Sequence, residues 1–148
     1  MVKFARKKGQ IAWFCVLIAL SVLMNYFGGL LATTYKLPVW LDSAGTVLAA
    51  YLGGPVCGAL VGMTGNFVAY IVYGDNWVYA IVSIAIGVVV GLAAKRKKFA
   101  SLLGIFTTAA MLAIPATVVA MPLNIFFGNK STGNVWGDAV YGFLMEDR

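Results

Sequence analysis

The distribution of charge is the feature of this sequence that most constrains its fold. Residues 11–127 are almost continuously apolar, and most of the basic residues gather in two short clusters. The clusters are Lys3, Arg6, Lys7 and Lys8, and then Lys95, Arg96, Lys97 and Lys98. Long apolar runs flanked by Lys and Arg are typical of membrane-spanning helices, whose cytoplasmic ends carry the excess of positive charge. The sequence therefore predicts an all-α, polytopic membrane helix bundle.

Composition supports a membrane protein and argues against a nucleic-acid partner. The 148 residues are 61% hydrophobic and 11% charged, which is far from the usage of soluble domains. A formal net charge of +6 is compatible with nucleic-acid binding, but eight of the eleven Lys and Arg belong to the two clusters beside apolar runs. We therefore interpret the charge as a topology signal. No linker or second compositional regime interrupts the chain, so residues 1–148 are predicted to form a single integral membrane domain.

Five complete spans and the beginning of a sixth are predicted, given that a helix needs about 20 residues to cross the hydrocarbon core. The spans cover about residues 11–32, 39–52, 56–73, 77–94 and 102–127, and residues 135–145 resemble the start of another. The first span follows basic residues as a signal peptide does, but its length predicts an uncleaved helix. The second span is short, so it is either buried among its neighbours or tilted in lipid.

Four spans between the two basic clusters place both clusters on one side of the membrane. The positive-inside rule makes that side the cytoplasm, so we expect a multi-pass protein of the cell membrane with a cytoplasmic N-terminus. Aromatic, amide and carboxylate side chains then gather in the outer loops. They include Trp40, Asp42, Tyr73, Asp75, Trp77 and Asn134. We therefore expect molecular recognition at the outer end.

Amides inside the apolar spans need hydrogen-bond partners, because lipid supplies none. Asn66, Tyr70 and Tyr73 fall at i, i+4 and i+7, so they share one helix face near the outer end. Asn124 lies toward the same level in the fifth span. Two interpretations stay open: hydrogen bonds between helices, or the lining of an outward-facing cavity.

The outer tryptophans and aspartates also have two interpretations each. Trp40 and Trp77 are expected either in the aromatic belt of the membrane interface or stacked on a planar ligand. Asp42 precedes a predicted helix, so we expect it to be the N-cap, with a ligand amine as a second partner. Asp75 is expected in a turn.

Small residues at helical spacing predict close helix packing. Gly54, Gly58 and Gly62 are four residues apart, and Gly87 and Gly91 repeat the spacing in the next span. Ala12, Cys15 and Ala19 form a comparable small face on the first span. That face contacts either a neighbouring helix or another subunit.

The sequence predicts neither an enzyme nor a metal protein. It has no His, which excludes His-based triads and His-containing metal sites, and Cys15 and Cys57 lie in apolar runs as isolated thiols. Asp42 and Asp75 are predicted at loop edges, where they do not form an intramembrane carboxylate pair. We expect no cofactor.

Residues 37–96 resemble the substrate-binding S components of energy-coupling factor (ECF) vitamin transporters. The resemblance rests on Leu41-Asp42-Ser43-Ala44-Gly45-Thr46, on Tyr51-Leu52-Gly53-Gly54-Pro55, on Gly58 to Gly62 with Asn66, and on Gly87 and Gly91 before the basic turn. Gly133-Asn134 and Asp138 fit the same layout. The resemblance implies a six-helix bundle that binds a small water-soluble vitamin or related heterocycle from outside.

The same resemblance implies partners and marks two departures. The partners are a membrane T component and two ATP-binding-cassette ATPases, because these 148 residues contain no phosphate-binding loop. The family's Ala-xxx-Ala contact in the first helix corresponds here to Cys15 and Ala19, with Ala12 beside them. The sixth helix is incomplete, so the chain is expected to be either truncated or a five-helix variant. A ligand sensor coupled to a kinase and a structural subunit without ligand are the alternatives.

Overall fold

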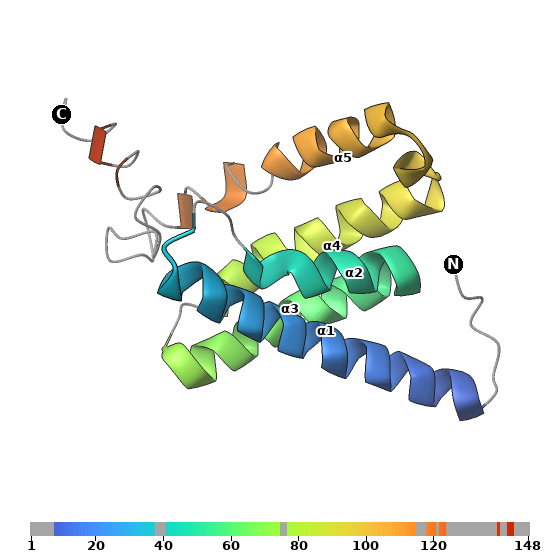
Figure 1. Cartoon of the computed structure of the whole chain (residues 1–148), viewed down its shortest axis with the longest axis horizontal. Coiled ribbons are helices and arrows are strands. Elements are labelled where there is room, and N and C mark those ends of the chain that lie inside the picture. Colours follow the sequence, from blue (N-terminus) through green and yellow to red (C-terminus); the bar gives the residue numbers. More distant parts are fainter. Residues whose placement is uncertain are drawn as a thin grey trace.

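The described residues of the computed structural model form an all-α bundle, as the sequence predicts (Figure 1). They are 8–37, 41–74, 77–114, 118–120, 122–123, 139 and 142–143. The α-helices are α1 (Lys8–Thr34), α2 (Ala44–Gly53), α3 (Pro55–Tyr73), α4 (Ala80–Lys95) and α5 (Leu102–Ile114). Three short 3-10 helices are η1 (Leu41–Ser43), η2 (Trp77–Tyr79) and η3 (Lys98–Ala100). No strand occurs in this part of the chain.

Three described segments are long and apolar enough to cross a membrane. They are Gly9–Thr34, Pro55–Val72 and Trp77–Lys95. Helix α2 has only 10 residues, about half of what a crossing needs, and it contacts α1, α3 and α4. Of the two arrangements open for the short second span, the structure has the one buried among neighbours. Helix α5 is apolar and is described as far as Ile114, and the remainder of the predicted span to residue 127 lies largely outside the described residues.

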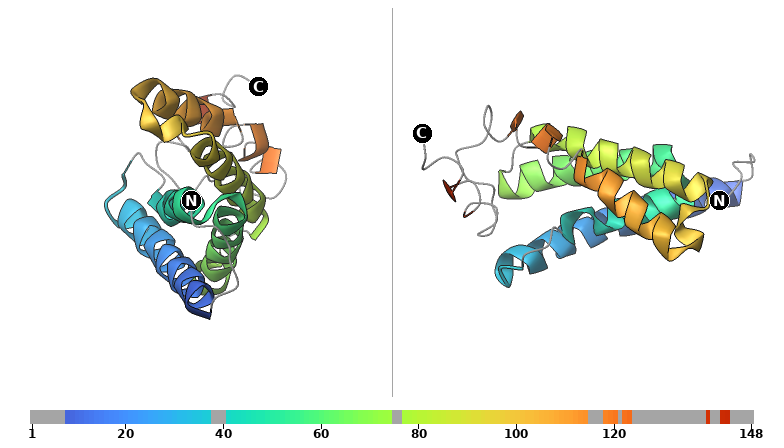
Figure 2. Two further views of the ribbon diagram at one scale, coloured as in Figure 1. Left: turned by 90° about the vertical axis from the view of Figure 1, so that its right-hand side faces the viewer. Right: turned by 90° about the horizontal axis from the view of Figure 1, so that it is seen from above.

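Helices α1 and α5 lie on opposite sides of the bundle, with α2, α3 and α4 between them (Figures 1 and 2). The start of α1, the α2–α3 turn and the α4–α5 turn meet at one end, which we call the basic end. The end of α1 with η1, and the end of α3 with η2, lie at the other end, which we call the aromatic end. Lys8 and Lys95 therefore lie at the same end, as the sequence predicts for the two basic clusters; Lys3, Arg6 and Lys7 are outside the described residues.

Glycines bring the helix backbones together. A Cβ at Gly87 would lie 2.6 Å from the Ala59 nitrogen and equally close to the Gly58 oxygen. A Cβ at Gly91 would collide with the Pro55 backbone at the α2–α3 turn. Contacts this short leave no room for a methyl group, so the spacing of glycines in α3 and α4 does serve helix packing.

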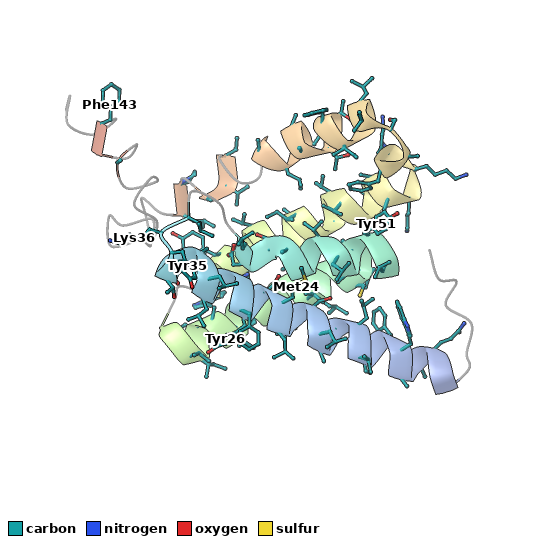
Figure 3. All side chains as sticks on the ribbon, in the orientation of Figure 1. Met24, Tyr26, Tyr35, Lys36, Tyr51 and Phe143 are labelled. Carbon is teal, nitrogen blue, oxygen red and sulfur yellow. The ribbon has the colours of Figure 1, made fainter. Side chains whose placement is uncertain are left out.

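The outer surface of the bundle is apolar and its interior is built from small side chains. Large hydrophobic residues along α1 and α5 are exposed, while Ala49, Cys57 and Val61 are fully buried around Leu17. Outward-pointing side chains cover the helices in Figure 3, where Met24 of α1 is one of the exposed residues. A soluble protein has the reverse distribution of large apolar side chains. This surface therefore faces lipid.

Candidate binding site

The candidate site lies at the aromatic end. Of the nine residues predicted to bind substrate, Asp42, Asn66, Tyr70 and Trp77 have described side chains. Tyr73 ends α3, but its side chain lies outside the described part of the structure, as do the residues Trp40, Asp75, Asn124 and Asn134.

Asn66 connects α3 to α4. Its Nδ2 donates one hydrogen bond to the Gly62 oxygen (2.9 Å) and another to Ser83 Oγ (2.7 Å). The hydrogen bond between helices, one of the two predicted roles, is therefore present. Among the described residues no group donates to Asn66 Oδ1, and the side chain is only half-buried. The described residues thus engage only the amide nitrogen, whose two hydrogen bonds fix the orientation of the side chain.

Two aromatic rings stack on each other, one from α3 and one from η2. The indole of Trp77 and the ring of Phe67 are nearly parallel, with their planes 11° apart and their centroids separated by 6.5 Å. Trp77 remains 51% exposed and Tyr70, one helical turn beyond Asn66, remains 48% exposed. Exposed aromatic surfaces thus occur on the same half of α3 as Asn66 and on the adjoining η2, and these surfaces also suit an aromatic belt.

Sequence reasoning missed Phe67 and Ser83. Phe67 directly follows Asn66, so it is rotated by about 100° from the face position of that amide, and its sequence does not separate it from other lipid-facing aromatics. Ser83 is the only hydroxyl in an otherwise apolar α4 sequence. A single hydroxyl in an apolar span is the sequence signal that could have identified Ser83 as the partner of the Asn66 amide.

Asp42 does not cap α2, which corrects the sequence prediction. The N-cap residue is Ser43, and its side chain makes no capping hydrogen bond; Ser43 Oγ instead lies 3.3 Å from Asp42 Oδ1. The capping group comes from α1: Asn25 Oδ1 accepts from the Thr46 N–H (3.1 Å), and Asn25 Nδ2 donates to Thr46 Oγ1 (2.8 Å). Asp42 belongs to η1 and is exposed at the aromatic end.

The small face of α1 points away from the bundle. Ala12, Cys15 and Ala19 are all exposed, whereas Leu17 and Ser21 on the other side of the helix are buried. The sequence predicted that this face contacts either a neighbouring helix or another subunit. None of the described helices covers it. The face is thus open to lipid or to another subunit.

Comparison with known proteins identifies the family. The family model described as "ECF transporter, substrate-specific component" matches residues 10–145, nearly the whole chain. No match is found among curated proteins or among solved structures. The chain belongs to the family of ECF transporter substrate-specific components.

Proposed function

We propose that this chain binds a small water-soluble vitamin or related heterocycle at the aromatic end and delivers it with a T component and two ATPases. The family match supports the general role. The observation that supports the binding proposal is that the outer half of α3 and the adjoining η2 carry an oriented amide, Asn66, together with exposed aromatic rings of Phe67, Tyr70 and Trp77. Such a combination of apolar walls and a few polar groups is typical of small-molecule sites.

Each group has a defined part in the proposed site. Trp77 and Tyr70 stack on a planar ring, each aromatic contact adding about 0.5–1.5 kcal/mol beyond area burial. Asn66 Oδ1 accepts a hydrogen bond, and the Asp42 carboxylate attracts a positively charged or donor group of the ligand. The remaining proposed contacts are Trp40, Tyr73, Asp75, Asn124 and Asn134.

Identification of the ligand is the direct test. The chain is purified in mild detergent and denatured, and released small molecules are identified by mass spectrometry. A stoichiometric vitamin or precursor supports the proposal. An empty protein that also fails to bind added vitamins favours a structural subunit without ligand.

Single substitutions test the site once the ligand is known. Asn66→Ala, Trp77→Ala and Asn124→Ala are each expected to weaken ligand affinity by about tenfold. Trp13→Ala is the matched control, because Trp13 is a comparably exposed indole near the basic end. Unchanged affinity in all three variants contradicts the proposed site.

The proposed orientation places the basic end in the cytoplasm. Lys36 lies at the aromatic end (Figure 3) and Lys97 at the basic end. In a background with both native cysteines replaced, Lys36→Cys is expected to react with a membrane-impermeant maleimide in intact cells. Lys97→Cys is expected to react only after permeabilisation. The opposite pattern contradicts this orientation.

We propose that the T component docks on Ala12, Cys15 and Ala19. A bulky side chain on this exposed face, as in Ala19→Trp, is expected to reduce co-purification with the T component and ATPases while ligand binding persists. Met24→Trp is the control, because Met24 is exposed on a different side of α1. Co-purification with a histidine kinase, in place of the ATPases, favours the sensor alternative.

A further inference from the structure

The turn between α4 and α5 presents four adjacent cations, and no carboxylate of the described residues lies near them. Lys95, Arg96, Lys97 and Lys98 are all exposed. The sequence has no acidic residue from 76 to 137, and Asp42, the one acidic residue whose side chain is described, lies at the opposite end. We call residues 95–101 the basic turn. Its positive charge is thus not neutralised by its sequence neighbours.

Several contacts hold the backbone of the basic turn in place. The Lys97 N–H donates to the Ala94 oxygen, and the Ala100 N–H donates to the Lys97 oxygen, both at 3.0 Å. Lys97 adopts a left-handed conformation with φ of 55°, which reverses the chain. The ring of Phe99 packs edge-on against Tyr51 of α2, with centroids 5.4 Å apart (Figure 3 labels Tyr51 at this end). The four cations therefore extend from a turn whose backbone is held by hydrogen bonds and by the packing of Phe99.

The start of α5 adds positive potential and an apolar wall to the same place. Ser101 Oγ accepts from the Gly104 N–H (3.1 Å), which caps the helix there. The positive end of the helix dipole therefore faces the basic turn. Leu102 and Leu103 follow at once, both 75% exposed, and Phe106 one turn later is also exposed. Positive charge and exposed apolar side chains thus lie side by side at the start of α5.

We propose that the basic turn binds the phosphate headgroup of an anionic phospholipid, whose acyl chains lie along the exposed residues of α5. An acidic protein would match the charge, but it would leave Leu102, Leu103 and Phe106 unexplained. Basic clusters beside membrane helices attract anionic lipids, each cation near the surface contributing appreciably to affinity. This binding is independent of the substrate proposed above and occurs at the other end of the bundle.

The test uses the purified full chain in uncharged detergent. Lipid adducts are counted by native mass spectrometry during titration with phosphatidylglycerol, with phosphatidylcholine, or with inorganic phosphate. Phosphatidylglycerol is expected to bind at least about tenfold more tightly than phosphatidylcholine, and added salt is expected to weaken it. Inorganic phosphate lacks acyl chains and is expected not to compete at equal concentration.

Variants locate the lipid on the basic turn. K97Q/K98Q is expected to lower phosphatidylglycerol affinity about tenfold, whereas K36Q, which removes a cation at the aromatic end, is expected to have no effect. F99A retains every cation but removes the ring contact that holds the basic turn against α2. It is expected to give a smaller decrease in phosphatidylglycerol affinity. If K97Q/K98Q does not fold, the phosphatidylglycerol affinity of K97Q and the salt dependence of binding to the native chain test the role of the basic turn instead.

Three outcomes overturn the proposal. Equal binding of phosphatidylglycerol and phosphatidylcholine removes the role of charge. An equal loss of affinity in K36Q and K97Q/K98Q removes the role of the basic turn. Effective competition by inorganic phosphate identifies a free-phosphate site without a lipid requirement.

Discussion

Two pairs of helices in this bundle, α1 with α2 and α3 with α4, are joined by the same residue types in different surroundings. Gly45 of α2 lies directly against the Ser21 backbone of α1, and Gly87 of α4 lies against the Gly58 backbone of α3. In each pair one asparagine crosses the interface to a hydroxyl, Asn25 to Thr46 and Asn66 to Ser83. The residue types and spacing are similar, but the surroundings of the two amides are not.

The difference lies in burial and in how each amide is used. Asn25 is 6% exposed and Thr46 is fully buried, and they exchange two hydrogen bonds that engage both the oxygen and the nitrogen of the amide. Asn66 is half-buried and uses only its nitrogen toward described residues. The first amide serves the fold, and the second is oriented by the fold and keeps an acceptor. Position relative to the bundle interior, more than residue type, thus distinguishes the two amides, and it is the reason why we propose a binding role for Asn66 alone.

The largest effect is expected when the α3–α4 contact is opened. Gly87→Ala places a methyl group against the Gly58 and Ala59 backbone, which cannot move aside as a side chain can. We expect a loss of about 2–3 kcal/mol in the free energy of unfolding in micelles, measured by tryptophan fluorescence. Gly9→Ala is the control, because nothing lies within 4 Å of a Cβ there. Equal stability of the two variants contradicts the close contact.

A smaller but still substantial loss is expected when the α1–α2 amide is removed. Asn25→Ala leaves the Thr46 N–H and hydroxyl without their partner in a buried interface, so unfolding free energy should fall by about 1–2 kcal/mol. Amide hydrogen exchange at Thr46 should accelerate in the same variant. Thr33→Ala is the control, since the Thr33 hydroxyl is exposed and donates only to carbonyls of its own helix. Identical effects of the two substitutions contradict the capping role of Asn25.

The sequence predicted features that depend on local pattern. Apolar runs and basic clusters predicted an all-helical membrane bundle, and the glycine spacing predicted where α3 and α4 approach. The i, i+4 relation also identified Asn66 and Tyr70 as neighbours on one face. These inferences needed only helix periodicity, which holds wherever the chain is helical.

Features that depend on contacts between distant residues were not predictable from local pattern. Asn25 and Thr46 are 21 residues apart, and their pairing depends on the angle at which α1 crosses α2. The N-cap rule selected Asp42 because Asp is a favoured capping residue. The turn of η1 instead places Ser43 at that position, and α1 supplies the amide that performs the capping. Ser83 was missed for the same reason, because its role is defined only by the opposing helix.

The smallest change in stability is expected at Asn66, where it distinguishes binding from structure. Both Asn66→Ala and Ser83→Ala remove the hydrogen bond between α3 and α4, and such bonds contribute only about 0.6 kcal/mol in membranes. Ser83→Ala, however, retains Asn66 Oδ1 and the bond from Nδ2 to the Gly62 oxygen. We therefore expect similar small losses of stability but unequal losses of affinity for the co-purified ligand, about tenfold for Asn66→Ala and little for Ser83→Ala. Equal ligand affinities of the Asn66→Ala and Ser83→Ala variants would assign Asn66 to helix packing alone. Asn66 and Asn25 would then differ in burial but not in role.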